Sequence, residues 1–458
     1  MDNQKTVPSL AECLEAADET KDMRIKKDCF ADIPGMLEQF EGYRSVFLAA
    51  DGSTWEAAGK RVKENLDRAG IPVTGTLIFP AEPRLHADYA HIQTLVEKMS
   101  PGKDRGQIPV AVGSGTINDL VKRAAFELKL PYLCVPTAAS VDGYTAFGAA
   151  ILLEGFKQTM PCAAPLAVAA DTEVLAGAPA YLSSSGFGDL ASKIIAGSDW
   201  IIADRAGKLG APGTHAMDGT AWAMTQHGLR AYLHRAVDSA RGDAAAVNAL
   251  FEALAITGLS MQYFKNSRPV SGAEHLFSHV WEMEDLSMNG VPVTHGHKVT
   301  IGTLASTAFT EIFFADPAGP PPVPRDYRRP EAPERRAEVS AAFRESRGHD
   351  GVVKTALEKM TGEKTVEAIN GDFRSAWKDL RGKVLEQVLP YGELRTLLER
   401  AGCPLKPEDI NLTRPYVIAT ARRAQMIRNK YSILDLAWDM GCFETVLARM
   451  EASDRYLR

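Results

Sequence analysis

Residues 109–143 read PVAVGSGTINDLVKRAAFELKLPYLCVPTAASVDG, and this stretch decides the fold. Residues 108–112 are apolar at nearly every position and too few for a helix, which indicates a strand buried on both faces of a parallel sheet. Gly113-Ser114-Gly115 follows, and residues 116–128 carry apolar side chains at helical spacing. Glycines let the backbone approach an anion, and a helix N-terminus offers unpaired N–H groups, so this order predicts a phosphate site. Because GSG lacks the full GxGxxG pattern, a simple tight turn is the alternative.

A second strand is expected directly after this helix. It covers residues 130–135 and ends in Pro-Thr-Ala-Ala-Ser, with Asp142 and Gly143 close behind. Ligands of open α/β sheets bind at the C-terminal ends of neighbouring parallel strands, so these polar residues favour a binding site. The alternative for Asp142 beside Gly143 is a turn.

The chain before this stretch alternates strands and helices. We expect strands over 45–50 and 73–79 and helices over 55–69 and 86–99, after a helical lead-in over 8–42. This alternation predicts a parallel, doubly wound sheet. Asp51 follows the first of these strands and would either accept hydrogen bonds from a ribose hydroxyl or cap the next helix.

The pattern changes after Gly143. Apolar segments at 147–153 and 166–170 predict an added hairpin, and Asp171-Thr172-Glu173 resembles a helix N-cap. Beyond it we find only helical periodicity, interrupted by a proline-dense loop over 314–336. The sequence therefore predicts an α/β domain over 1–170 and an all-helical domain over 171–458.

Composition excludes several classes of protein. The 458 residues carry a net charge of −6, which argues against a general nucleic-acid binder. The polar, acidic N-terminus shows no signal peptide, and no apolar run is long enough for a membrane span. The six cysteines lack any paired spacing, which predicts reduced thiols in a cytoplasmic protein.

Three places in the helical half carry residues that suit chemistry better than packing. Asp189 is followed four residues later by Lys193, although a first-turn carboxylate with an intrahelical lysine partner is the alternative. His275 and His279 share one helix face, which indicates a metal or acid–base site or else core histidines. The third place is residues 294–299, which contain His295. Together Asp189, His275 and His295 offer one carboxylate and two imidazoles, a set that would suit a divalent metal that polarises a carbonyl.

The motifs GSGTIND, PTAASVDGYT, GFGDL, SGAEHLFSH and THGHKV, in this order, resemble the iron-containing alcohol dehydrogenase superfamily. Within it the chain is similar to the glycerol-1-phosphate dehydrogenase group. The resemblance implies a dehydroquinate synthase-like fold, with a Rossmann-like dinucleotide domain, an all-α metal- and substrate-binding domain and an active site in the cleft between them. Ala146 stands where relatives often have serine, so one hydroxyl contact is expected to be missing.

The resemblance also implies a set of site residues, with NAD or NADP and one divalent ion (Zn²⁺, Ni²⁺ or Fe²⁺) as cofactors. The metal ligands would be Asp189, His275 and His295. The dinucleotide would be held by Asp51, Gly113, Ser114, Gly115, Thr116, Asp119, Thr137 and Ser140. The Asp51 carboxylate favours NAD over NADP, because it would repel the 2′-phosphate of NADP. Substrate binding and catalysis would fall to Asp142, Lys193 and His279. Cations available for a substrate phosphate are Lys157, Lys193, Lys265 and Arg268.

The expected reaction is reduction of dihydroxyacetone phosphate to sn-glycerol 1-phosphate, in a homodimer or higher homo-oligomer. One alternative is an unphosphorylated polyol substrate. Another is a cyclising lyase of the dehydroquinate synthase type, which Asp189 disfavours because those enzymes use glutamate as the carboxylate ligand. A silent binding protein with a structural metal is the last alternative, and such sites usually close with four ligands, often cysteines, that are not found near this set.

Overall fold

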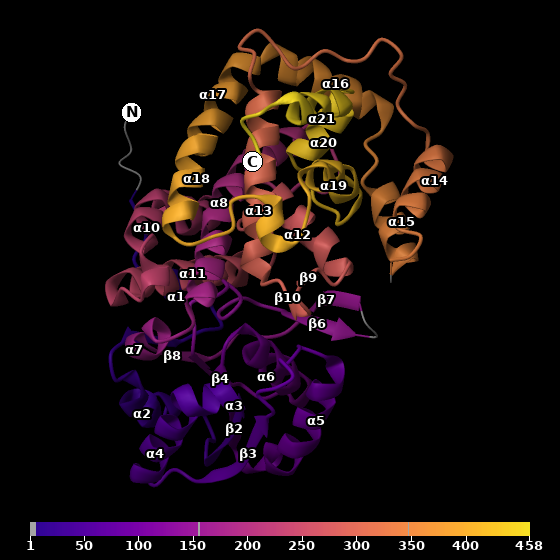
Figure 1. The fold of residues 1–458 in the computed structure, drawn as a ribbon. Coiled ribbons are helices and arrows are strands. Elements are labelled where there is room, and N and C mark those ends of the chain that lie inside the picture. Colours follow the sequence, from indigo (N-terminus) through magenta and orange to yellow (C-terminus); the bar gives the residue numbers. More distant parts are fainter. Residues whose placement is uncertain (1–5, 154–155, 347) are drawn as a thin grey trace. The chain divides into compact units, whose positions relative to one another are not determined.

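The computed structural model describes residues 6–153, 156–346 and 348–458. Two compact units divide the chain (Figure 1). The first comprises residues 1–190 and 223–266, and the second comprises 191–222 and 267–458. Helix α8 (Ala180–Gly207) continues through the division at residue 190. The predicted domain boundary at residue 171 stays a prediction.

The first unit is built on a six-stranded parallel sheet in the order β1-β8-β5-β4-β2-β3. Its strands are β1 (Asp22–Lys26), β2 (Ser45–Asp51), β3 (Val73–Phe79), β4 (Gln107–Gly113), β5 (Leu133–Pro136) and β8 (Ala167–Asp171). From β2 the chain passes to β3 on one side and then returns to β4 on the other. The strand order therefore reverses between β2 and β4, and ligands of such sheets bind at the carboxyl ends beside this reversal.

Helices cover both faces of this sheet. They are η1 (Cys29–Asp32), α2 (Ile33–Leu37), α3 (Gly52–Thr54), η2 (Trp55–Gly59), α4 (Lys60–Arg68), α5 (Tyr89–Met99), η3 (Ser100–Arg105) and α6 (Gly115–Leu128). Helix α1 (Leu10–Ala16) packs on α11 (Ala244–Phe264). One buried cluster joins α2 and α4 to alternate residues of β2 and β4, such as Leu48 and Val110. Figure 1 shows α5 and α6 on the opposite side of these strands. The predicted doubly wound architecture is confirmed.

Two predictions for this unit are wrong. The lead-in is not wholly helical, because residues 22–26 form edge strand β1 beside β8. The predicted hairpin between 147–153 and 166–170 does not form either: β6 (Ala149–Leu153) pairs with β7 (Phe156–Met160), and β8 enters the main sheet. All five residues of β8 are buried, as expected of a central strand in a parallel sheet. The polar composition of β1 gave no strand signal in the sequence.

The first unit also contains helices that follow residue 171, in the part of the sequence predicted to be a separate helical domain. They are α7 (Thr172–Ala176), η4 (Ala223–His227), α10 (Leu229–Ala236), η5 (Ser239–Arg241) and α11 (Ala244–Phe264). Asp171 caps α7 through the backbone N–H groups of Glu173 and Val174, as its sequence predicts. In length and apolar character α11 could cross a membrane, but 78% of its apolar window is buried within the fold, as in a core helix.

The second unit is helical apart from the two-residue strands β9 (Ser287–Met288) and β10 (Val291–Pro292). Its helices are the end of α8, α9 (Gly219–Trp222), α12 (Ala273–Met283), α13 (His295–Phe313), α14 (Ala332–Ala342), α15 (His349–Glu358), α16 (Glu363–Ser375), α17 (Trp377–Gln387), α18 (Tyr391–Arg400), η6 (Pro407–Ile410), α19 (Arg414–Met426), α20 (Ile433–Asp439) and α21 (Phe443–Ala452). Helix α13 is buried along nearly its whole length and packs on α12, α18 and α21. The proline-dense segment links α13 to α14, with its last residues in α14.

Candidate cofactor and metal site

The reversal of strand order brings together Asp51 and the glycine turn, which follow neighbouring strands β2 and β4. The Asp51 carboxylate accepts a hydrogen bond from the Thr54 backbone N–H (2.9 Å), and the Thr54 hydroxyl accepts one from the Asp51 N–H (3.0 Å). The helix-capping interpretation of Asp51 is therefore correct. A contact to a ribose stays a prediction.

The backbone of Gly113, at the end of β4, lies against the first turn of α6. A Cβ atom on Gly113 would lie 2.6 Å from the Cβ of Ile117, so a larger residue does not fit there. Ser114, Gly115 and Thr116 are partly exposed at the first turn of α6. Their backbone N–H groups precede the first intrahelical hydrogen bonds, and this arrangement suits the pyrophosphate of a dinucleotide.

The remaining predicted cofactor residues lie on α6 and after β5. The Asp119 carboxylate accepts a hydrogen bond from the Ala150 N–H (3.2 Å), so this side chain contacts the hairpin. Thr137 and Ser140 are almost fully buried after β5. The Ser140 hydroxyl lies 3.2 Å from the Tyr144 hydroxyl, which donates to the Ala138 carbonyl. These contacts order the loop that leads to Asp142.

This loop meets α8 closely because α8 carries small residues there. A Cβ atom on Gly186 would lie 1.9 Å from the Ala139 carbonyl oxygen. One turn further on, the Asp189 carboxylate accepts a hydrogen bond from the Asp142 backbone N–H (3.0 Å). Asp189 is fully buried and lies nine residues inside the helix. The alternative of a first-turn carboxylate is therefore wrong, since the serines and glycines that suggested a helix start belong to α8.

Asp189, His275 and His295 each offer one ligand atom, and these atoms lie within 4.8 Å of one another. Asp189 comes from α8, His275 from the first turn of α12 and His295 from the first residue of α13. The α12 and α13 backbones approach closely at Gly302, which has no Cβ atom. A Cβ atom there would lie 2.3 Å from the Glu274 carbonyl oxygen. The three residues named from the sequence are thus brought together.

Two carboxylates orient the imidazoles. Glu274 Oε1 lies 2.7 Å from His275 Nδ1, and Glu282 Oε1 lies 2.8 Å from His295 Nδ1. A histidine whose Nδ1–H donates to a carboxylate presents the Nε2 lone pair, which is the usual arrangement around a protein-bound metal. Two neutral imidazoles and one carboxylate fit a divalent ion such as Zn²⁺, Ni²⁺ or Fe²⁺.

Asp199 supports this arrangement, and sequence reasoning missed it. Its carboxylate accepts hydrogen bonds from the Ala273 N–H (2.6 Å) and the Ile433 N–H (2.8 Å), so it joins the first residues of α12 and α20. Burial, with a contribution from the Glu274 charge, raises the pKa of Asp199 to about 7. Asp199 lies ten residues after Asp189 on α8, and a lone carboxylate at that spacing gives no sign of this role in the sequence.

Lys193 is fully buried and His279 is partly buried. The His279 ring centroid lies 6.2 Å from that of His275, and its Nδ1 lies 3.4 Å from Glu282. Burial lowers the pKa of His279 to about 3, so the imidazole is neutral at neutral pH. The Lys193 side chain follows Asp189 by four residues on α8, and its charge opposes the burial that raises the pKa of Glu274.

The cations predicted for a substrate phosphate differ in surroundings. Lys265 forms ion pairs with Glu19 (2.5 Å) and Asp18 (3.4 Å). Arg268 is fully buried and donates to the Asp199 backbone carbonyl. The Lys157 side chain lies outside the described residues. Of these cations, Lys193 is the one that lies on the same helix as a candidate metal ligand.

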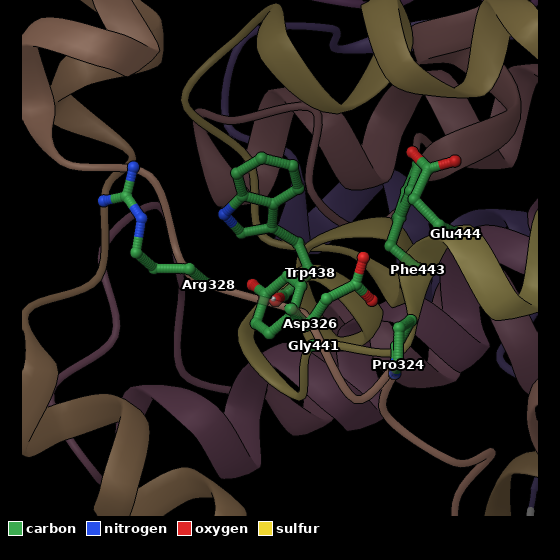
Figure 2. A pocket seen from close by; sticks show the side chains of 8 residues that line it. Pro324, Asp326, Arg328, Trp438, Gly441, Phe443 and Glu444 are labelled. Atoms are coloured by element: carbon green, nitrogen blue, oxygen red, sulfur yellow. Dashed lines mark hydrogen bonds between the residues drawn. The ribbon is translucent and has the colours of Figure 1, made fainter.

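A separate pocket of about 400 Å³ lies between the proline-dense segment and the turn from α20 to α21 (Figure 2). It is lined by Pro324, Asp326, Tyr327, Arg328, Trp438, Gly441, Phe443 and Glu444. None of these residues belongs to the predicted cofactor, metal or substrate sets. The chemistry predicted from the sequence is therefore not located in this pocket.

Comparisons with known proteins agree with the geometry. A family model described as iron-containing alcohol dehydrogenase matches residues 24–179. A curated glycerol-1-phosphate dehydrogenase (NAD(P)+) of Geobacillus thermodenitrificans is 35% identical over 61% of this chain and 67% of its own length. The corresponding protein of Geobacillus stearothermophilus is 27% identical over 90% of this chain and 91% of its own. In fold, the chain is similar to a probable glycerol dehydrogenase of Sinorhizobium meliloti (TM-score 0.59, 16% identity, 95% of this chain and 98% of that one).

Proposed function

Because the chain belongs to the iron-containing alcohol dehydrogenase family, we propose that it is a metal-dependent NAD(P)H oxidoreductase that interconverts dihydroxyacetone phosphate and sn-glycerol 1-phosphate. The observation that carries this proposal is the set of ligand atoms on Asp189, His275 and His295, gathered within 4.8 Å in a chain whose curated relatives are named glycerol-1-phosphate dehydrogenases. The Asp189 carboxylate also supports a dehydrogenase over the lyase alternative.

The metal would be held by these three residues, with Glu274 and Glu282 orienting the imidazoles. With a divalent ion bound, the site gains a Lewis acid that polarises a carbonyl and stabilises negative charge on its oxygen. The protein contributes a buried carboxylate and two imidazoles whose tautomers are already set, so few side chains need to reorganise when the ion binds.

The dinucleotide would bind at the carboxyl ends of β2 and β4. The first N–H groups of α6 would receive the pyrophosphate, which involves Gly113, Ser114, Gly115 and Thr116. Asp51 would lie by the adenosine ribose, and Asp119, Thr137 and Ser140 complete the proposed contacts. The bound nicotinamide would supply the hydride, and the glycine turn would hold the pyrophosphate of the cofactor.

Asp142 would contact the substrate hydroxyls. Its backbone N–H donates to Asp189, so this residue lies beside a candidate metal ligand. Lys193 is the proposed cation for the phosphate, and neutral His279 would relay a proton. The cytoplasmic location and a homodimer or higher homo-oligomer stay predictions. The six cysteines are buried thiols, which supports a reducing compartment.

The test is oxidation of NADH and of NADPH by dihydroxyacetone phosphate, before and after chelation and with Zn²⁺, Ni²⁺ or Fe²⁺ restored separately. We expect turnover to vanish with the chelator and to return with a metal, and the product to be the sn-1 phosphate. Dihydroxyacetone is the matched substrate without phosphate. Faster turnover of dihydroxyacetone than of its phosphate would replace this proposal by a polyol dehydrogenase.

His275→Ala provides the matched protein control. It removes one of three ligands from a helix that is otherwise held by packing, so it should bind no metal and turn nothing over while its circular dichroism is unchanged. A metal-free, fully active His275→Ala enzyme would contradict the assignment of the site.

A further inference from the structure

Lys122 is a lysine of α6 with a fully buried side chain in the first unit. Its ammonium group donates hydrogen bonds to three backbone carbonyls, those of Gly143 (2.7 Å), Ala146 (2.9 Å) and Gly148 (3.1 Å). An ammonium group has three donors, so each of them has an acceptor in one short loop. A buried charge is costly unless it is satisfied in this way, and charge-assisted hydrogen bonds are stronger than neutral ones.

The loop held by Lys122 is residues 142–148, which begins at the predicted substrate residue Asp142. One further contact connects it to α6, since Asn118 Nδ2 lies 3.5 Å from the Gly143 carbonyl. Just beyond the loop, Asp119 accepts a hydrogen bond from the N–H of Ala150 in β6. The same helix carries the glycine turn at its N-terminus. The loop and the proposed pyrophosphate site are therefore built on one rigid element.

The far side of the loop is held by other helices. The Thr145 hydroxyl donates to the Ala255 carbonyl (2.8 Å), and Gln262 donates to the Thr145 carbonyl (2.8 Å), both from α11. At its start the Asp142 N–H donates to the candidate metal ligand Asp189. A change in the position of this loop therefore reaches both a substrate contact and a metal ligand.

We propose that Lys122 is a positioning residue of the reaction: by gathering the carbonyls of residues 143, 146 and 148, it fixes the loop that carries Asp142 and donates to Asp189. This inference rests on the proposed function. Its ammonium group uses its three donors within the loop, and the Asp119 carboxylate lies 3.9 Å from it. Loss of this group should disturb mainly the substrate and metal side of the site, because Asp119 keeps its hydrogen bond from the Ala150 N–H and the glycine turn is unchanged.

The test compares Lys122→Met, which keeps the length of the side chain without its charge, with Lys98→Met at an exposed lysine of α5. We expect Lys122→Met to lower kcat/KM for dihydroxyacetone phosphate at least tenfold and to change the Kd for NADH, measured by fluorescence, less than twofold. The visible absorption spectrum of the Co²⁺-substituted protein should change, and amide hydrogen exchange should rise at residues 143–148. Lys98→Met should match the wild type in all four.

Wild-type kcat/KM with a wild-type cobalt spectrum in Lys122→Met would overturn the proposal. An equal loss of NADH binding and turnover would also overturn it, because it would show general damage to the unit. If Lys122→Met does not fold, Lys122→Gln is the second variant: its amide retains two donors that help the fold, but its shorter, uncharged side chain cannot satisfy all three carbonyls, so kcat/KM should still fall and exchange at residues 143–148 should still rise. Failure of both variants to fold would assign Lys122 to folding alone.

These readouts separate this inference from the proposed function. If the wild type does not turn over dihydroxyacetone phosphate, the proposed reaction fails. NADH binding, the cobalt spectrum and hydrogen exchange at residues 143–148 still report whether Lys122 holds the loop, because they need no substrate.

Discussion

Gly302 sets the spacing of α12 and α13, the two helices that supply the histidines of the candidate metal site. Its substitution by alanine tests how stability and metal binding depend on that spacing. A Cβ atom there would lie 2.3 Å from the Glu274 carbonyl oxygen, roughly 1 Å short of the ordinary contact distance of 3.4 Å. The obstacle is backbone of α12, which cannot rotate away as a side chain can. Helices α12 and α13 must therefore separate.

Forced overpacking of this kind costs about 1–3 kcal/mol, partly offset by about 0.5–1 kcal/mol that alanine gains over glycine within a helix. We expect Gly302→Ala to lower the free energy of unfolding by about 1–2 kcal/mol. Because His295 lies on α13 and His275 adjoins Glu274, the shift should also weaken Zn²⁺ binding at least tenfold, on the order of 1.4 kcal/mol.

Gly371→Ala is the matched control, since this glycine is exposed within α16 and no atom lies within 4 Å of its added Cβ. It should stabilise the protein by about 0.5–1 kcal/mol and leave metal binding unchanged. Urea denaturation of the metal-free proteins and competition with a chelator measure the two effects. A Gly302→Ala protein as stable as Gly371→Ala, with wild-type metal affinity, would refute the reasoning.

Three further substitutions test other parts of the structure. Gly113→Ala places a Cβ atom 2.6 Å from a side chain of α6, so it should raise the Kd for NADH at least tenfold by fluorescence titration, whereas Gly35→Ala, with no neighbour within 4 Å, should bind NADH as the wild type does. Glu282→Ala removes the acceptor 2.8 Å from His295 Nδ1 and should weaken metal affinity about 10–100-fold in chelator competition; an unchanged affinity would count against the orienting role. Arg414→Ala leaves four backbone carbonyls near the C-terminus without their shared donor, so we expect about 1–3 kcal/mol lower stability and faster proteolysis of the C-terminal helix.

The sequence was sufficient for the features that depend on short-range periodicity. The apolar run, the glycine turn and the following helical spacing placed β4 and α6 correctly, because strand and helix periods and the freedom of glycine are local properties. The candidate metal ligands also stand out in the sequence, since histidines and an aspartate that do not suit packing lie in an apolar context. The structure brings their ligand atoms within 4.8 Å of one another, and metal binding by them stays a prediction.

Tertiary structure alone decided which partners the polar groups find. Lys122 reads in the sequence as an ordinary helix charge, and its role depends on carbonyls more than twenty residues away. Lys265 and Arg268 looked equally available for a phosphate, but neighbouring carboxylates and a carbonyl already engage them. The pairing of β6 with β7, and of β1 with β8, likewise depended on long-range contacts. Local pattern fixes what a segment can form, whereas burial and hydrogen-bond satisfaction across the whole fold determine which side chains are left for chemistry.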